Sequence, residues 1–252
     1  METVERVTRI GSSIIRLDRV DSTNDYLKRI SKTVTEGAVV YANEQTRGRG
    51  RGKNSWLVPR GKGLTMSILL SAPAEPVTAP RFNIFPAVAI VDCLRALHID
   101  AHIKWPNDII LRGRKIGGIL VESISRQGKL KLILGIGLNV RQEPIDFPDS
   151  LRPFAGSLKS LTGTEYDIGF IFEMVLEKMD EIYAAIQTLS GWQNVREKWN
   201  DYCGHIGRPV AITSRDSEKI GIFIGIDENG FAVIEGEQQF IVRDYTQISL
   251  MF

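Results

Sequence analysis

Residues 109–140 read IILRGRKIGGILVESISRQGKLKLILGIGLNV, and this stretch decides the fold. It contains three apolar runs rich in β-branched residues, at 109–111, 116–123 and 130–140. The breaks at 112–115 and 126–128 carry the charged and glycine residues of turns. Strand-like runs joined by breaks this short favour antiparallel pairing, so the stretch predicts a three-stranded meander.

The segments around this meander alternate between strand and helix patterns. Strands are expected at 14–20, 37–44 and 64–70, and helices at 21–32, 80–97, 168–187 and 192–202. Ser22, followed by Asp25 three residues later, resembles a capping box for the first helix. Strands and helices of this kind in one stretch of chain indicate a mixed α+β domain.

The C-terminal residues carry a different pattern. Residues 204–209 resemble a linker, and five short strand-like runs follow, at 210–213, 221–226, 231–234, 240–242 and 247–250. Turn residues separate these runs, and this spacing is typical of a small β-barrel. We therefore expect two domains, at 1–204 and at 205–252.

Composition excludes several classes of protein. Of the 252 residues, 43% are apolar and 25% charged, as in ordinary soluble domains. Because no apolar run reaches the length of a membrane span, no membrane partner is expected. The charged N-terminus lacks the apolar core of a signal peptide. Cys93 and Cys203 lie far apart, so we expect neither disulfide nor zinc framework, and a cytoplasmic location.

The positive charge of the chain is local rather than general. The net charge is only +2, too small to indicate a nucleic-acid binder by itself. Residues 43–62 nevertheless hold six basic side chains and a single acid, Glu44. Within them, 45–56 read QTRGRGRGKNSW. Glycine lets backbone N–H groups approach an anion and arginine binds one bidentately, so this segment fits a phosphate or carboxylate. A solvated loop and an RNA-binding Arg-Gly segment are the alternatives.

Two further segments place polar groups where a ligand could meet them. Residues 21–25, DSTND, put small hydrogen-bonding side chains at a helix N-terminus, which suits a neutral head group or an anion, although simple capping explains them as well. Residues 104–108, KWPND, end a strand-like approach with Lys104 and Asp108. Asp108 could orient a nucleophile or take its proton, whereas the alternative is an ordinary turn.

Glycines inside two strands form the last candidate. Residues 115–122 read KIGGILVE and 135–140 read GIGLNV. Glycine weakens a strand, so its presence on both indicates a ligand lying across the sheet, with helix packing or a bulge as the alternative. No dinucleotide-binding fingerprint is present, because the third glycine and the following helix are missing. The three histidines, His98, His102 and His205, have no metal-ligand spacing and are interpreted as ordinary core or surface residues, so no metal site is expected.

Five motifs occur in one order between residues 20 and 140: Asp-Ser-Thr-Asn at 21–24, Gln-x-x-Gly-Arg-Gly-Arg at 45–51, Lys-Trp-Pro-Asn-Asp at 104–108, Lys-x-Gly-Gly-Ile-Leu-Val-Glu at 115–122 and Gly-Ile-Gly-x-Asn at 135–139. In this order they resemble the biotin protein ligase family, and their joint occurrence is specific. Bacterial members often read Gly-Arg-Gly-Arg-Arg-Gly, so Lys53 receives no role by analogy. Only about 20 residues precede the Ser-Thr-Asn motif, too few for a helix-turn-helix domain. The chain therefore resembles the monofunctional type, without DNA binding.

The resemblance implies a fold and a reaction. The fold is a largely antiparallel mixed sheet with helices, like that of class II aminoacyl-tRNA synthetases, with an SH3-like C-terminal barrel. The reaction forms biotinyl-5′-AMP from biotin and ATP, with Mg²⁺ on the phosphates, and then transfers biotin to a lysine of a biotin carboxyl carrier domain. The resemblance leaves the acceptor, the choice between monomer and homodimer, the role of the barrel and the general base open.

Residue roles follow from the same resemblance. Three groups of side chains are expected: Ser22, Thr23, Asn24, Gln45, Gly50, Gly117 and Gly118 at biotin; Arg49, Arg51, Trp56, Lys115 and Asn139 at ATP or the adenylate; and Arg49, Arg51, Lys104, Asp108 and Lys115 in the chemistry. A lipoate or octanoate ligase or transferase is the nearest rival, but it would need an extended apolar slot. A nucleic-acid binder and a biotin sensor without transfer activity are two further rivals.

Overall fold

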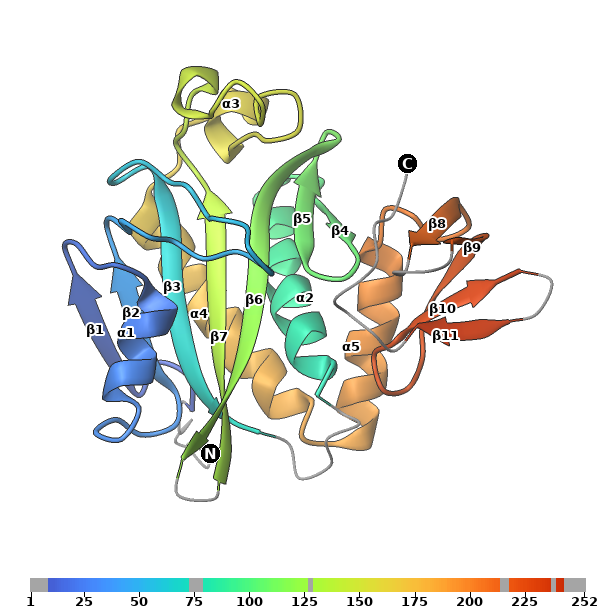
Figure 1. Cartoon of the computed structure of the whole chain (residues 1–252), viewed down its shortest axis with the longest axis horizontal. Helices are drawn as coiled ribbons and strands as arrows, with labels where there is room; N and C mark the ends of the chain where they lie inside the picture. Colours follow the sequence, from blue (N-terminus) through green and yellow to red (C-terminus); the bar gives the residue numbers. More distant parts are fainter. Residues whose placement is uncertain (1–8, 73–78, 127–128, 214–217, 237–238, 243–252) are drawn as a thin grey trace, which may run out of the picture.

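A single seven-stranded sheet dominates the molecule (Figure 1). The computed structural model describes residues 9–72, 79–126, 129–213, 218–236 and 239–242. The strands lie in the order β1-β2-β3-β7-β6-β5-β4. Their bounds are Ser13–Leu17 (β1), Ala38–Ala42 (β2), Gly63–Ser71 (β3), His102–Lys104 (β4), Asp108–Leu111 (β5), Arg114–Arg126 (β6) and Lys129–Asn139 (β7). Only β1 and β2 pair in parallel; the other neighbours are antiparallel.

The predicted meander forms the centre and one side of this sheet. Strands β5, β6 and β7 pair antiparallel, as expected from their short connections. The register shifts between Ile109 and Ile110, where a bulge brings Asp108 opposite Gly118. Strand β4, which the sequence indicated only as a strand-like approach to Pro106, forms the edge.

Helices cover both faces of the sheet. Figure 1 shows α2 (Arg81–Ala96), α4 (Ile168–Ala185) and α5 (Leu189–Tyr202) on one face and α1 (Thr23–Ile30) on the other. Helix α2 is apolar nearly all round because it is enclosed: it contacts the sheet, α4 and α5. Within the described chain, no helix combines the length and the apolar character that spanning a membrane requires.

Helix α1 begins as the sequence predicted. The Ser22 side chain accepts a hydrogen bond from the Asp25 backbone N–H at 3.4 Å, which satisfies one of the donors at the helix start. The second half of the predicted capping box is replaced by another contact, because the Asp25 carboxylate instead accepts from Arg49 at 2.8 Å. The start of α1 is thus tied to the Gly/Arg segment.

One connection contains structure that the sequence did not indicate. Between β7 and α4 the chain forms a 3₁₀ turn at Pro144–Asp146 and the short helix α3 at Leu158–Thr162. This connection returns to the sheet, because the Lys115 N–H donates to the Phe154 carbonyl at 2.8 Å. It therefore closes one end of β6 (Figure 1).

A second, four-stranded antiparallel sheet follows α5. Its strands are Pro209–Thr213 (β8), Glu218–Ile226 (β9), Ala232–Glu235 (β10) and Phe240–Val242 (β11), in the order β11-β10-β9-β8. The fifth predicted strand, at 247–250, lies outside the described residues. Phe223 of β9 is fully buried and packs against Trp199 and Trp105 at ring-centroid distances of 6.3 and 6.5 Å. The small sheet therefore shares a core with the large one.

Candidate active site

A cavity of about 300 Å³ lies between α1 and the large sheet, since residues of both line it. Side chains from all four candidate segments line it. Of the residues selected from the sequence, those lining it are Ser22, Thr23, Asn24, Gln45, Arg49, Gly50, Arg51, Trp56, Lys104, Asp108, Lys115 and Gly118. Gly117 and Asn139 do not line it. Segments far apart in the chain thus meet at one concave site, as a small-molecule site requires.

The floor of the cavity near α1 is a buried cluster of neutral polar groups. The Thr23 N–H donates to Gln45 Oε1 at 2.7 Å, and the Thr23 hydroxyl lies 3.1 Å from the same oxygen. Ser67 Oγ lies 2.7 Å from Thr23 Oγ1 and 2.5 Å from Asn24 Oδ1. Thr23, Asn24 and Ser67 are each at most 3% exposed. Buried polar groups need such partners, so the cluster is held in one arrangement.

Ser67 is a member of this cluster that the sequence motifs did not indicate. It lies on β3 with Thr65 two residues earlier, and both are buried. Successive side chains of a strand face opposite sides, so two polar residues at this spacing in an apolar strand share one face. This two-residue spacing of polar residues was a signal in the sequence that could have indicated Ser67. It does not show, however, which face of the sheet α1 covers.

The Gly/Arg segment folds back on itself over the sheet. The Gly50 N–H donates to the Asn54 carbonyl at 2.8 Å, and the Trp56 N–H donates to the Gly48 carbonyl at 3.0 Å. A Cβ on Gly48 would lie 2.2 Å from the Trp56 carbonyl oxygen, so only glycine permits this approach. The fold-back places the Trp56 ring against β7.

The glycines of β7 make room for protein side chains. A Cβ on Gly135 would lie 2.4 Å from Asn24 Oδ1, and one on Gly137 would lie 2.3 Å from the Trp56 ring. The sequence indicated a ligand lying across these glycines. The structure shows Asn24 of α1 and Trp56 of the Gly/Arg segment in contact with them, and both glycines also line the cavity, so a ligand across them stays a prediction.

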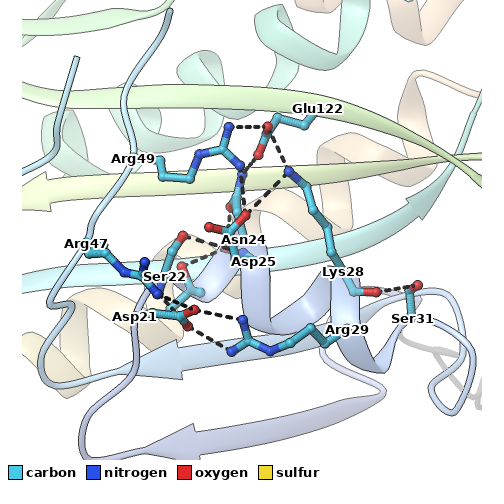
Figure 2. A network of polar contacts seen from close by, with 12 residues as sticks. Asp21, Ser22, Asn24, Asp25, Lys28, Arg29, Ser31, Arg47, Arg49 and Glu122 are labelled. Atoms are coloured by element: carbon cyan, nitrogen blue, oxygen red, sulfur yellow. Dashed lines mark hydrogen bonds and ion pairs between the residues drawn. The ribbon is translucent and has the colours of Figure 1, made fainter. Parts of the chain in front are cut away.

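Arg49 is held by two carboxylates (Figure 2). Its guanidinium lies 2.8 Å from Asp25 Oδ1 and 2.9 Å from Glu122 Oε1. Burial would lower the pKa of Arg49, but the hydrogen bonds and charges of Asp25 and Glu122 outweigh it and raise the pKa. The side chain is 38% exposed. Arg49 is therefore a permanent positive charge at the rim of the cavity.

A second group of charges lies on the other wall. Lys115 Nζ contacts Asp108 Oδ1 at 2.5 Å and lies 5.9 Å from the centre of the Trp56 ring. Burial lowers the pKa of the Lys104 ammonium; Asp108 opposes this shift and Lys115 adds to it. A Cβ on Gly118 would lie 3.4 Å from Lys115 Nζ, an ordinary contact. Two lysines and one carboxylate thus face the same space.

Gly117 and Asn139 are not among the residues that line the cavity, and their expected roles stay predictions. Side chains alternate along β6, so Gly117 faces away from Gly118, and a Cβ on it would lie 3.1 Å from the Leu138 side chain. Asn139 is 4% exposed; its amide donates to the Gly156 carbonyl at 2.9 Å and its Oδ1 accepts from Gln142 at 2.8 Å. Asn139 therefore anchors the connection after β7 to the sheet.

His205 connects the small sheet to the Lys-Trp-Pro-Asn-Asp segment. It is 1% exposed, its Nε2 accepts from the Trp105 N–H at 3.3 Å, and its ring lies 4.6 Å from that of Phe223. Burial, together with the charges of Lys104 and Arg208, lowers the pKa of His205 to about 4. The ring is therefore neutral near pH 7 and can accept this hydrogen bond.

Known proteins are similar to this chain in sequence and in structure. A family model described as the biotin/lipoate A/B protein ligase family matches residues 17–139, and one for the biotin protein ligase C-terminal domain matches residues 205–245. The chain is 32% identical to the bifunctional ligase/repressor BirA of Bacillus subtilis, over 90% of this chain and 70% of that protein. It is 30% identical to the biotin–[acetyl-CoA-carboxylase] ligase of Paracoccus denitrificans, over 87% and 93%.

Solved structures agree with the sequence matches. The biotin protein ligase of Aquifex aeolicus in complex with biotin and ATP superposes with a TM-score of 0.83 at 27% identity, covering 95% of this chain and 99% of that one. The expected fold class, a mixed sheet with helices and a small C-terminal β domain, is confirmed. The chain belongs to the biotin/lipoate A/B protein ligase family and carries the C-terminal domain of the biotin protein ligases.

Proposed function

We propose that this chain is an ATP-dependent biotin protein ligase whose cavity holds both reaction steps. In the first step a carboxylate oxygen of biotin bonds to the α-phosphorus of ATP, and the bond to pyrophosphate breaks. In the second, a lysine amine of a carrier domain bonds to the acyl carbon; AMP leaves with the electron pair, and the amine loses a proton. The observation that carries the proposal is one cavity with a neutral polar floor and cationic walls.

The neutral floor suits the ureido ring of biotin. That ring presents one carbonyl acceptor and two N–H donors and bears no charge. We assign Ser22, Thr23, Asn24 and Gln45 to its recognition, with Gly50 and Gly118 beside the rest of the ligand. Thr23, Asn24 and Gln45 are held by the contacts described above, so little side-chain freedom is lost on binding. A lipoyl group offers no matching polar head, and leaving the floor unpaired would weaken its binding.

The cationic walls suit the first step, in which two anions approach each other. Arg49, Arg51, Lys104 and Lys115 line the same cavity and supply fixed positive charge. Mg²⁺ enters this proposal as the counter-ion of the substrate ATP. Among the described residues, no group of three or more His, Cys, Asp or Glu side chains could hold a metal ion. The chain's own contribution is thus to bind and orient the two anions.

Trp56 and the Gly/Arg segment protect the intermediate. A mixed anhydride of biotin and AMP hydrolyses in water, so the site must exclude solvent between the steps. Trp56 lies over β7 and beside Lys115, and Arg49 and Arg51 lie on the same segment. We propose that this segment tightens when the adenylate binds its arginines, acting as a lid.

Asp108 is our candidate for the second step. Its carboxylate is bound by Lys115 at 2.5 Å, and its side chain is 24% exposed. When phosphate oxygens attract the Lys115 ammonium, the Asp108 carboxylate becomes available to the amine of the incoming lysine. It then orients that amine or accepts its proton. Lys104, beside it, supports the phosphate.

The partners proposed are biotin, ATP and a biotin carboxyl carrier domain, in a cytoplasmic setting that suits the free, buried thiols of Cys93 and Cys203. We place the domain boundary at 204/205, with catalysis in 1–204. DNA has no place in the proposal, because the net charge of the chain is only +2. Size measurement in solution distinguishes a monomer from a homodimer.

The experiment is incubation with ATP, Mg²⁺, biotin and a carrier domain, followed by mass measurement of the carrier. We expect a mass increase of one biotinyl group that requires both ATP and the acceptor lysine. A matched reaction with lipoate should leave the carrier unchanged. Modification by lipoate but not biotin, or adenylate formation without transfer, would overturn the proposal.

A further inference from the structure

Glu122 of β6 connects two parts of the site that have separate tasks. Its Oε2 accepts a hydrogen bond from the Asn24 side-chain amide at 2.9 Å. Its Oε1 lies 2.8 Å from Lys28 Nζ and 2.9 Å from Arg49 Nη2. Asn24 belongs to the neutral floor, whereas Arg49 belongs to the Gly/Arg segment (Figure 2). One carboxylate therefore contacts the groups proposed for biotin's head and for its activation.

We propose that Glu122 is a positioning residue that couples recognition of the ureido ring to placement of the Gly/Arg segment. This inference rests on the proposed function. The Glu122 side chain is only 18% exposed, and a carboxylate so placed needs charge partners. Lys28 and Arg49 provide them, and Asp25 lies within 3.5 Å of Lys28 and 2.8 Å of Arg49. The two positive charges of Lys28 and Arg49 thus balance the two negative charges of Asp25 and Glu122.

The carboxylate fixes the orientation of Asn24. An ionised carboxylate only accepts hydrogen bonds, so Asn24 must present its NH₂ group to Glu122. The Asn24 Oδ1 then faces Ser67 Oγ at 2.5 Å. The single hydroxyl proton of Ser67 is then committed to Asn24, and Ser67 Oγ also lies 2.7 Å from Thr23 Oγ1. Glu122 thereby fixes which atom of the Asn24 amide faces the floor that meets biotin.

The second oxygen acts on the Gly/Arg segment. Arg49 is bound at both sides, by Asp25 from α1 and by Glu122 from β6. The Asp25 carboxylate contacts the cations Arg49 and Lys28, whereas the Glu122 carboxylate also contacts Asn24 directly. Of the two acids that hold Arg49, Glu122 therefore joins the segment to the floor. This difference makes Asp25 the matched control.

The test compares Glu122→Gln with Asp25→Asn. Glutamine keeps the shape, but its NH₂ group replaces one acceptor, so a donor must face either Asn24 or the two cations. We expect Glu122→Gln to raise the Kd for biotin about tenfold or more by calorimetry, and to shorten the retention time of bound adenylate. Asp25→Asn should change the Kd for biotin by less than about threefold while also shortening retention. Thermal unfolding of both variants checks that they fold.

A compensating variant separates positioning from general damage. In the double variant Asn24→Asp/Glu122→Gln the amide and the carboxylate exchange places, and Ser67 still faces an acceptor. We expect the Kd for biotin of this double variant to be at least about threefold lower than that of Glu122→Gln. No recovery, or equal loss of biotin affinity in Glu122→Gln and Asp25→Asn, would overturn the coupling. Failure of the wild-type protein to bind biotin would instead overturn the proposed function.

Discussion

Replacing Gly137 with alanine should force Trp56 away from the sheet. The new Cβ would lie 2.3 Å from Cε2 and 2.4 Å from Nε1 of that ring, whereas ordinary contacts begin at 3.4 Å. The ring must therefore retreat by about 1 Å. Strand β7 cannot yield instead, because it pairs with β3 on one side and β6 on the other along its length. The Gly/Arg segment has to move.

The cost of this overlap is typical of overpacking, about 1–3 kcal/mol. If that energy acts on the closed position of the Gly/Arg segment, the population of the closed position falls by roughly 5- to 150-fold. The adenylate would then be exposed to water more often. We expect Gly137→Ala to form biotinyl-5′-AMP but to hydrolyse it faster, so that pyrophosphate release exceeds biotin transfer to the carrier.

The assay follows labelled biotin with ATP and measures adenylate lifetime and transferred biotin in parallel. Gly204→Ala is the matched control, because its Cβ would lie 3.5 Å from the nearest atom, in His102, outside the cavity. Trp56→Ala in the Gly137→Ala background should add little further loss, since the ring is already displaced. An unchanged adenylate lifetime in folded Gly137→Ala, or fully additive losses, would refute the reasoning.

Three further predictions concern single residues. Arg49→Ala should weaken binding of biotin or the adenylate by about 1.5–3 kcal/mol, the worth of a charge-assisted hydrogen bond, and unchanged affinity by calorimetry would exclude its role. Asp108→Asn should bind biotin and form the adenylate but transfer it about a hundredfold more slowly; normal single-turnover transfer would count against Asp108. Because burial lowers the pKa of His205 from 6.5 to about 4, protons bind the unfolded chain first as the pH falls, so stability is lost over that range. As the pH falls over this range, the free energy of unfolding measured with urea should decrease by up to about 3 kcal/mol in the wild-type protein and by less in His205→Gln. Equal pH dependence in both proteins would contradict this assignment.

Local elements of the fold could be read directly from the chain. Apolar runs rich in β-branched residues and short breaks predicted β5, β6 and β7, and the helix pattern at 80–97 predicted α2. These signals are local, since side-chain period and turn chemistry act within a few residues. The parallel pairing of β1 with β2 and the turn at Pro144–Asp146 carried no comparable signal. The strand pairing depends on residues distant in the chain, whereas the turn is held locally by a capping box between Glu143 and Asp146.

The glycines show how a local signal can mark a position without identifying the residues that approach it. Gly135 and Gly137 do mark a close approach, as glycine in a strand indicates. The side chains that approach them are Asn24 and Trp56, and the ligand inferred from the sequence stays a prediction. Neither residue is near the glycines in sequence, so only the folded chain could identify them.

The sequence by itself determined most of the elements, the family resemblance and most of the residues that line the cavity, because those depend on short motifs. The tertiary structure alone decided that Ser67, Glu122 and His205 belong at or beside the site. Each is a polar residue outside the motif roles inferred from sequence, and its partner lies more than 40 positions away. Strand pairing and helix packing bring such residues together. The physical reason is that the pairing register of a sheet decides which distant residues share a face, whereas a motif depends on neighbouring residues alone.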